Sequence, residues 1–372
     1  MKIWFWQLII SPHMSDLVKA LADKDVSVTL VVQQEMSADR AAQGWVAPDI
    51  GKAKLLKAAT AEQMRIFAES APADVIHICQ GIRGNGVIQQ AQKTLAQLKR
   101  KQFIVMETVD DPGWKGYLKR ATYWYLFKRL NSSLTGILAT GSKTKDWVIA
   151  RGINSEKVFP FAYFLRENTI KQDGYLSKDD EPFRALFVGR IIGLKRIDLL
   201  MRAVSILSSK NVKLVVVGSG PLENELKELA DKCIPDQIEW IGQLPMSDVR
   251  NEMLKSDCLI LPSRHDGWGA VVSEALMSGT PAICSDTCGS ACVVPRGKYG
   301  DVFESGNLDD LAHALERIVN NGKLKREERF QLAEWAKCLG ADAGANYLLQ
   351  VLKAIEKSSI KPIEPWKQAS AE

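Results

Sequence analysis

The sequence contains no run of about 18 or more apolar residues, the length that a membrane-spanning helix needs. The first residues, MKIWFWQLIISPHM, carry a lysine and a short apolar run but lack the small-residue cleavage site of a signal peptide. We therefore expect a first β-strand there, and a protein that lies on a membrane if it meets one. The 7 cysteines are an odd number, scattered through the chain, which fits a reducing, cytoplasmic compartment better than a disulfide framework.

Metal-ligand patterns are also scarce. Cys284, Cys288 and Cys292 lie four residues apart without the paired two-residue spacing of zinc sites, so we expect them to be structural. The only Asp-x-Asp triplet is Asp23-Lys24-Asp25, in a predicted turn where solvated carboxylates are the simpler interpretation. We find no internal repeat and no low-complexity tract.

The composition is that of an ordinary soluble globular protein. With 46% hydrophobic and 25% charged residues, disorder of the whole chain is excluded, and 372 residues suffice for two domains. Residues 1–175 hold 24 Lys/Arg against 16 Asp/Glu, whereas residues 176–372 hold 25 against 28. The first half is therefore the better candidate to face an anionic surface or substrate; a merely solvated basic face is the open alternative. We expect no nucleic-acid partner.

Short apolar runs alternate with helical patterns along almost the whole chain. The expected strands are KIWFWQLII, VSVTLVV, DVIHIC, FIVME and GILAT, followed by RALFVG, VKLVVVG, IEWIG, CLILP and PAICS. The expected helices cover 12–23, 86–100, 114–130, 196–209, 221–232, 246–256, 269–278 and 307–320. This alternation predicts an α/β fold with parallel sheets covered on both faces, which bind ligands outside the carboxyl ends of the strands.

One polar stretch, LRENTIKQDGYLSKDDEPF, breaks the alternation and is the best linker candidate. We therefore predict a first Rossmann-like, doubly wound domain over 1–165 and a linker over 166–182. A second such domain follows over 183–355, and a tail occupies 356–372, for which a return to the first domain is an open alternative. The two domains are expected to face each other across a cleft.

Two cations follow the first strand of the second domain. Arg190 and Lys195 flank a short loop before the next helix. Two cations at the carboxyl end of a strand suit a diphosphate, because arginine offers a rigid fork and lysine a point charge. The alternative is a pair of surface cations at a turn.

The loops after the next two strands are weaker signals. Gly218 and Gly220 precede a helix, and glycines there allow backbone N–H groups to approach a ligand at the helix N-terminus. A tight turn is the alternative. Gln243 and Leu244 follow IEWIG, where their backbone is expected to pass along a flat base.

The stretch RHDGWGAVVSEALMSGTPAI (264–283) sets two carboxylates around a glycine-rich helix start. Gly267 and Gly269 keep the backbone open, so that its N–H groups and dipole can hold an anion. From Gly269 to Glu274 the helix rises about 7.5 Å at roughly 1.5 Å per residue, so Asp266 and Glu274 can address different parts of one elongated ligand. A carboxylate accepts two hydroxyls, as a sugar diol requires. A capping Asp266 and a solvated Glu274 are the alternatives.

In combination these loops resemble a known family. The runs FVGRIIGLKRIDLL, LVVVGSGP, IEWIGQLP and PSRHDGWGAVVSEALMSGTPAICSD are similar to the donor-binding domain of retaining glycosyltransferases of the GT-B fold, and most similar to glycosyltransferase family 4. They follow the family's order and spacing over about residues 183–320. The rest of the chain matches more loosely, through its strand pattern and ADVIHI.

The resemblance assigns roles to the loop residues. It implies that Asp266 and the backbone of Gly267, Trp268 and Gly269 meet the donor sugar. It implies that Glu274 holds the ribose, and that Arg190 and Lys195 hold the diphosphate. The family commonly has Glu in the first acidic position, so Asp266, which is one methylene shorter, is a departure.

The resemblance agrees with the chemistry of these residue types. Cleavage of a sugar–diphosphate bond builds negative charge on the leaving phosphate, which fixed cations and a helix N-terminus stabilise. We therefore expect transfer without a metal or another cofactor. Retention of anomeric configuration is implied by the resemblance alone.

The first domain is expected to bind the acceptor through the loops SPHM, CQGIRGNG and METVDDPGW. His13 is a candidate contact to donor or acceptor, and Glu107 ends a strand where a base-like or acceptor-positioning carboxylate is plausible. A polar residue at a helix start is the alternative for His13. His77 lies inside the strand DVIHIC and is expected to be a core residue. The glycine pair that the family often has in its first loop is absent.

The segment GWKGYLKRATYWYLFKRLN (113–131) mixes six aromatic residues with five cations. Aromatic rings with long cationic side chains suit the interface of an anionic membrane. The positions do not form one clean stripe at helical spacing. A well-buried domain helix with charged ends therefore stays an open alternative.

The predicted function is transfer of a sugar from a nucleotide-sugar donor, UDP-sugar favoured, to a glycan or lipid-linked acceptor. The resemblance suggests a role in bacterial surface polysaccharide or lipopolysaccharide synthesis, in the cytoplasm or at the inner face of its membrane. A nucleotide-sugar epimerase of the same fold and a non-catalytic nucleotide-sugar-binding protein are the alternatives.

Overall fold

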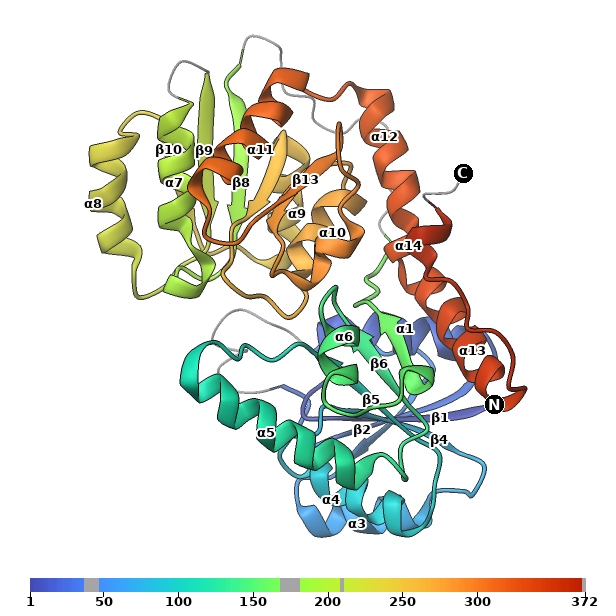
Figure 1. Cartoon of the computed structure of the whole chain (residues 1–372). Coiled ribbons are helices and arrows are strands. Elements are labelled where there is room, and N and C mark those ends of the chain that lie inside the picture. Colours follow the sequence, from blue (N-terminus) through green and yellow to red (C-terminus); the bar gives the residue numbers. More distant parts are fainter. Residues whose placement is uncertain (37–46, 168–180, 208–210, 370–372) are drawn as a thin grey trace. The chain divides into compact units, whose positions relative to one another are not determined.

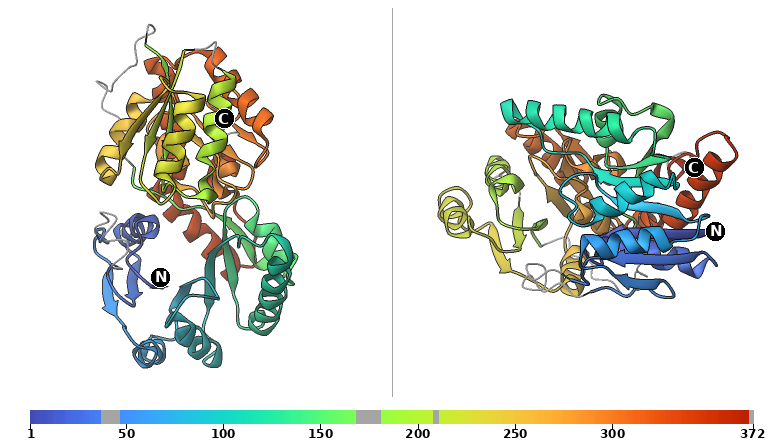
Figure 2. Two further views of the ribbon diagram at one scale, coloured as in Figure 1. Left: turned by 90° about the vertical axis from the view of Figure 1, so that its left-hand side faces the viewer. Right: turned by 90° about the horizontal axis from the view of Figure 1, so that it is seen from below.

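The computed structural model describes residues 1–36, 47–167, 181–207 and 211–369 and divides the chain into two compact units (Figure 1). The first unit comprises Met1–Arg166 with Leu339–Glu372, and the second comprises Glu167–Cys338. Each unit is built on one sheet, and helices cover both faces of each sheet (Figures 1 and 2). The predicted α/β class with two Rossmann-like domains is confirmed.

The first unit has seven strands in the order β3-β2-β1-β4-β5-β6-β7, and every neighbouring pair is parallel. The inner strands are near-continuous buried apolar runs, as expected of a parallel sheet covered on both faces. The strands are β1 (Lys2–Gln7), β2 (Ser27–Val32), β3 (Lys54–Lys57), β4 (Ile76–Gln80), β5 (Gln102–Glu107), β6 (Gly136–Thr140) and β7 (Val158–Phe161).

Helices follow most of these strands. Their starts carry local signals: Pro12 begins the first helix, and Thr60 and Gln63 form a capping box before the second. The helices are α1 (Pro12–Asp23), α3 (Ala61–Ser70), α4 (Ile88–Gln97), α5 (Gly113–Leu130), α6 (Thr144–Ile149), α13 (Ala341–Glu356) and α14 (Pro365–Gln368).

The return of the chain to the first unit begins earlier than predicted. The predicted boundary at residue 355 is wrong, because α13 packs on the first unit over its whole length. The Leu165 N–H donates to the carbonyl of Leu339 (3.1 Å), and the Tyr347 hydroxyl donates to the Pro160 carbonyl (2.9 Å). Gly344 lies so close to the Phe164 ring that an added Cβ would meet it at 2.2 Å. The predicted linker, 166–182, lies mostly outside the described residues.

The second unit has six strands in the order β10-β9-β8-β11-β12-β13, again all parallel. Its strands are β8 (Phe183–Val188), β9 (Val212–Val217), β10 (Ile238–Gly242), β11 (Cys258–Leu261), β12 (Ala282–Ser285) and β13 (Gly300–Phe303). Its helices are α7 (Ile197–Ile206), α8 (Glu223–Cys233), α9 (Met246–Lys255), α10 (Ala270–Met277), α11 (Leu308–Asn321) and α12 (Arg326–Trp335).

Three strands escaped prediction, and all three are edge strands: β3, β7 and β13. Their sequences are KLLK, VFPF and GDVF. Edge strands tolerate lysine, proline and acidic residues because one side of the strand needs no ladder partner, and these residues hide the apolar pattern of a strand.

The strand order of each sheet reverses at one point, between β1 and β4 in the first unit and between β8 and β11 in the second. Loops leave such a point on opposite sides, which opens a crevice at the carboxyl edge of the sheet. In the second unit, the loops that leave β8 and β11 carry the predicted charged residues.

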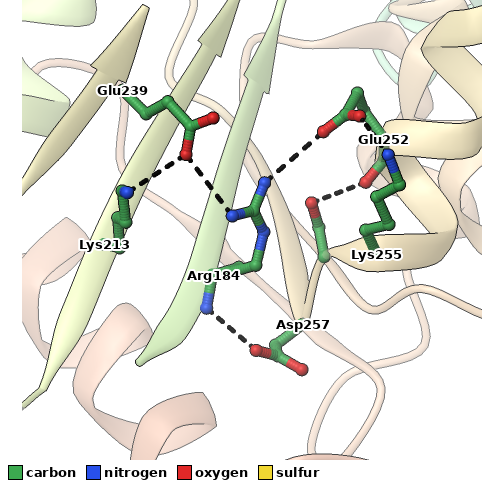
Figure 3. A network of polar contacts seen from close by, with 7 residues as sticks. Arg184, Lys213, Glu239, Glu252, Lys255 and Asp257 are labelled. Atoms are coloured by element: carbon green, nitrogen blue, oxygen red, sulfur yellow. Dashed lines mark hydrogen bonds and ion pairs between the residues drawn. The ribbon is translucent and has the colours of Figure 1, made fainter. Parts of the chain in front are cut away.

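The opposite, amino edge of the second sheet is held by a charged network (Figure 3). The guanidinium of Arg184, at the start of β8, lies 3.4 Å from the carboxylates of Glu239 and Glu252. The backbone N–H of Arg184 donates to the Asp257 carboxylate (2.8 Å). Asp257 also pairs with Arg329 of α12 (3.4 Å), and both side chains are buried. The network joins four elements at the edge away from the candidate site.

We expect Asp257→Ala to lower the free energy of unfolding by about 3–5 kcal/mol, because it leaves the Arg329 guanidinium buried without a counter-charge. Lys255→Ala is the matched control, since this lysine is exposed and its one ion pair among the described residues is with Glu252; the substitution should cost no more than about 1 kcal/mol. Denaturant unfolding measures both. Equal midpoints for the two variants would contradict this account.

Candidate functional site at the carboxyl edge of the second sheet

Neighbouring loops at the carboxyl edge of the second sheet are joined by hydrogen bonds in sheet order. The Gly218 N–H donates to the carbonyl of Gly242 (2.8 Å), which ties the β9 loop to the β10 loop. The Arg264 N–H donates to the carbonyl of Leu194 (2.9 Å), which ties the β11 loop to the β8 loop. The Gly289 N–H donates to the Asp266 carbonyl (2.9 Å) and adds the β12 loop. The predicted residues of the second unit thus stand on one connected platform.

Lys195 and Asp266 meet on this platform. The Lys195 Nζ lies 2.5 Å from Oδ2 of Asp266, and each side chain is only 19% exposed. The pair spans the point where the strand order reverses. From the sequence, these residues were expected to address different parts of a ligand. In the structure, Asp266 holds the ammonium in place, while its Oδ1 has no hydrogen-bond partner among the described residues.

Arg190 is in the opposite situation. Its side chain is exposed and forms no ion pair with any carboxylate that the structure describes. Arg190 therefore offers an uncompensated cation beside a compensated one. An incoming anion can pair with Arg190 without first breaking a salt bridge.

The glycines of the β9 loop serve packing. A Cβ on Gly218 would lie 1.9 Å from the carbonyl oxygen of Gly189, and one on Gly220 would lie 2.3 Å from that of Ile191. They are needed where the two loops approach each other. This packing role fits the tight turn considered as the alternative, and the approach of a ligand to this backbone stays a prediction.

The start of α10 has the predicted open backbone. Gly269 precedes the helix at φ 84°, a left-handed conformation that favours glycine. The side chain of Trp268 is buried, and its Nε1–H donates to the Ser273 hydroxyl (3.2 Å). The buried indole of Trp268 therefore holds the loop against α10. Only the backbone of Trp268 can contact a ligand. Gly267 packs against Gly289, where a Cβ would meet the Gly267 carbonyl at 2.0 Å.

Glu274 lies on the second turn of α10. It is half-buried, and its side chain makes no hydrogen bond or ion pair with any residue that the structure describes. Burial raises its pKa to about 7. A solvated carboxyl, the alternative considered for Glu274 from the sequence, does not fit this environment. A desolvated carboxyl with its hydrogen-bonding capacity unused is typical of a ligand site.

Of the remaining predicted donor residues, Gln243 accepts a hydrogen bond from the Ser219 hydroxyl (3.3 Å) and is exposed. Leu244 beside it is half-buried. Both lie in the β10 loop, at one end of the platform.

The first unit brings its two candidates together through a residue that the sequence did not reveal. The ring of His13, at the start of α1, stacks on Tyr163 with 5.2 Å between centroids and 13° between planes. The Tyr163 hydroxyl donates to Oε1 of Glu107 at the end of β5 (2.5 Å). Tyr163 follows the edge strand β7, which itself was not predicted, so no pattern marked it.

His77 is the core residue that the sequence predicted. His77 is buried, its Nδ1 accepts a hydrogen bond from Trp6 Nε1 (3.2 Å), and burial lowers its pKa to about 3. Cys284 and Cys288 are buried in the second unit, whereas Cys292 is exposed. Within the described ranges, no three His, Cys, Asp or Glu side chains are grouped as metal ligands would be.

Residues 169–336 match the family model Glycosyl transferases group 1, and this span coincides with the second unit. The Anabaena protein HepE, solved in complex with UDP, superposes with a TM-score of 0.73 at 13% identity and covers 95% of this chain and 100% of its own. The lipopolysaccharide outer core galactosyltransferase WaaB superposes with a TM-score of 0.68 at 17% identity, over 94% and 99% of the two chains. The chain has the GT-B fold.

Curated relatives match over part of the GT-B chain. The capsular polysaccharide biosynthesis glycosyltransferase CapM of Staphylococcus aureus is 26% identical over 199 residues, which are 53% of this chain and 52% of CapM. The uncharacterized glycosyltransferase MJ1178 of Methanocaldococcus jannaschii is 28% identical over 178 residues, 46% and 50% of the two chains. The chain spans about half the length of these relatives, and its match to the group 1 family model lies in the second unit.

The raised pKa of Glu274 predicts a pH-dependent stability. Below about pH 4.5 the carboxyl is protonated in both folded and unfolded chains. As pH rises from there to about 7, only the unfolded chain ionises fully, so stability is lost by up to about 3 kcal/mol. Glu274→Gln should remove this loss and be more stable than wild type at pH 8 but not at pH 4.

Urea unfolding at the two pH values measures this difference. Glu225→Gln is the matched control, because this glutamate is exposed on α8 of the same unit. A Glu274→Gln profile parallel to that of the wild type would show that the carboxyl is not desolvated.

Proposed function

We propose that this protein is a retaining glycosyltransferase of glycosyltransferase family 4, which moves a hexose from a nucleoside diphosphate sugar to a glycan or lipid-linked acceptor. The observation that carries the proposal is the carboxyl-edge platform of the second unit. On the segments that follow two neighbouring strands, β8 and β11, it sets an exposed cation, a cation held by Asp266, and a half-buried carboxyl without a described side-chain partner. These are the groups that a diphosphate and a ribose diol need.

In the proposed reaction the bond between the sugar and the diphosphate breaks, and negative charge develops on the leaving phosphate. Arg190, Lys195 and the N-terminus of α10 stabilise this charge as it forms. Asp266 keeps Lys195 aligned before the donor arrives, so little reorganisation is needed at the moment of reaction. Its second oxygen, Oδ1, is available to a hydroxyl of the donor sugar.

Glu274 accepts the two ribose hydroxyls in this proposal. As a carboxylate it offers lone pairs to both, and a bound diol replaces the water that burial removes. Donor binding then favours the ionised form of a group whose pKa is about 7. The affinity for a nucleotide sugar should therefore rise as pH increases from 6 to 8.

We further propose that UDP-sugars are the donors and that no metal or other cofactor takes part, because side-chain cations and a helix end supply the positive charge. HepE was solved with UDP and with UDP-glucose, which supports a uridine nucleotide. The names of CapM and WaaB support a role in surface polysaccharide or lipopolysaccharide synthesis. The proposed location is the cytoplasm, at the inner face of the membrane.

A thermal-shift and turnover screen of UDP-, GDP- and ADP-sugars tests the donor class. The proposal expects the largest upward shift with a UDP-sugar, and sugar transfer in its presence. An epimer formed without transfer, or binding without any turnover of the donor, would overturn it in favour of an epimerase or a binding protein.

Arg190→Ala should lower kcat/KM by about 100-fold, because a cation facing the developing phosphate charge is lost. Arg202→Ala is the matched control, since this arginine is exposed on α7 of the same unit. Rates with and without chelator should agree. Full activity in Arg190→Ala, or activity abolished by chelator, would disprove charge stabilisation by side chains alone.

Tyr163→Phe should lower the transfer rate by about tenfold or more while the affinity for UDP stays unchanged. The variant keeps the ring stacked on His13 but removes the hydroxyl that orients Glu107. Glu107→Gln should show the same separation of transfer from UDP binding. A Tyr163→Phe enzyme with unaltered transfer kinetics would limit this tyrosine to a packing role.

A further inference from the structure

The helix α5 of the first unit has aromatic residues on two opposite faces. Tyr123 and Phe127 are buried and pack against Trp147 of α6, with ring centroids 5.0 Å and 6.3 Å from it. On the other face, Trp114, Tyr117, Trp124 and Tyr125 are exposed. The helix is the long teal element of the first unit in Figures 1 and 2. The alternative of a well-buried helix therefore does not hold for this second face.

The exposed residues form a stripe, contrary to the reading from the sequence. Positions 114, 117, 118, 121, 124, 125 and 128 follow the i, i+3, i+4, i+7 spacing of one helical face. The buried aromatic residues follow the same period on the opposite face. Because both faces carry aromatic residues, neither stripe can be recognised from the sequence alone. Trp114, Tyr117, Leu118, Trp124 and Tyr125 are between 49% and 70% exposed. We call these five residues the aromatic stripe.

Three cations border the aromatic stripe and are available to a partner. Lys115, Lys128 and Arg129 are exposed and form no ion pair with any described carboxylate. Lys128 lies over the Trp124 ring (5.0 Å), and Arg129 lies 5.7 Å from that of Tyr125. The helix itself contains no Asp or Glu. The surface is thus apolar and aromatic at its centre and purely cationic at its border.

The two remaining cations of the segment do different work. The Lys119 ammonium donates to the Asp110 carbonyl (2.5 Å), and the Arg120 guanidinium donates to that of Asp111 (2.8 Å). Both bonds fold the preceding turn onto the start of the helix. Lys119 and Arg120 are therefore structural, and substitutions there do not test a surface role.

From this face we infer that α5 docks the protein on an anionic lipid bilayer, with the aromatic stripe in the headgroup region and Lys115, Lys128 and Arg129 on lipid phosphates. Trp and Tyr favour the membrane interface because their rings are apolar and their N–H and O–H groups need polar neighbours. The 18-residue helix spans about 27 Å at roughly 1.5 Å per residue. A helix of this length that lies flat on a bilayer contacts several lipid headgroups. No helix of the described ranges is long and apolar enough to cross a bilayer.

Charge complementarity selects this partner. A protein partner would need a surface that is apolar at its centre and acidic around it. A second copy of this chain could not offer such a surface through its own α5, because α5 contains no Asp or Glu. A bilayer with anionic headgroups supplies apolar depth and negative charge together. The inference deepens the proposed function, because a lipid-linked acceptor lies in such a bilayer and α5 would bring the first unit to it.

Co-sedimentation with vesicles of equal parts phosphatidylglycerol and phosphatidylcholine tests this docking. We expect binding that weakens steeply as salt increases, and little binding to phosphatidylcholine alone. Lys128→Glu/Arg129→Glu should weaken binding by at least about 25-fold, from roughly fivefold for each cation removed. Trp114→Ser/Trp124→Ser should weaken it about tenfold or more while thermal unfolding stays unchanged, because both rings are exposed.

The matched control is Lys54→Glu/Lys93→Glu, which makes the same charge change on exposed lysines of β3 and α4 in the same unit. Vesicle binding that is equal in the control and in the α5 charge variant overturns the inference. So does a change in oligomeric state of the Trp variant, by light scattering, without a change in vesicle binding, because the stripe is then an interface between copies.

The UDP-induced thermal shift and donor hydrolysis by the same variants separate this inference from the proposed function. If docking is right, the α5 variants lose vesicle binding but keep the response to UDP. A protein that binds vesicles through α5 but never turns over a nucleotide sugar leaves docking intact and disproves the transfer reaction.

Discussion

The contact between Lys195 and Asp266 is the interaction on which the candidate site depends. The two residues are 71 positions apart in the chain and leave strands that are neighbours at the point where the strand order reverses. Their pairing fixes the β8 loop against the β11 loop and places a cation at the edge of the α10 start. Because each charge is largely desolvated, loss of either partner would leave the other poorly compensated. The platform is thus set before any ligand binds.

The two edges of the second sheet differ in how their charged groups are paired. At the amino edge, charged groups are paired with one another: the Arg184 guanidinium pairs with Glu239 and Glu252, and the buried Asp257 pairs with Arg329. At the carboxyl edge, Arg190 has no described acidic partner and Glu274 has no side-chain partner. A desolvated charged or polar group without a partner lowers the stability of a folded protein. The concentration of such groups at one edge of the sheet is the observation on which we base the proposed donor site.

The first unit also carries its candidate residues at the carboxyl edge of its sheet, but these are aromatic and hydrogen-bonded groups. Its carboxyl edge joins His13, Tyr163 and Glu107 into a chain of stacked and hydrogen-bonded groups. Away from this edge, α5 uses aromatic residues for two purposes, since Tyr123 and Phe127 build the core while Trp114 and Trp124 face outward. A helix with this composition gains stability from only one of its faces. The other face is the one that we propose to lie on an anionic bilayer.

The sequence by itself determined the class of fold, most strands and helices, and the identity of the charged loop residues, because periodicity and glycine-rich loops are local signals. The edge strands and the early return of α13 needed the tertiary structure, since packing against distant residues such as Phe164 defines them. The same holds for the site. Arg190 and Glu274 were visible as residue types, but the union of Lys195 with Asp266 and the link through Tyr163 arise only when the sheets bring separate loops together.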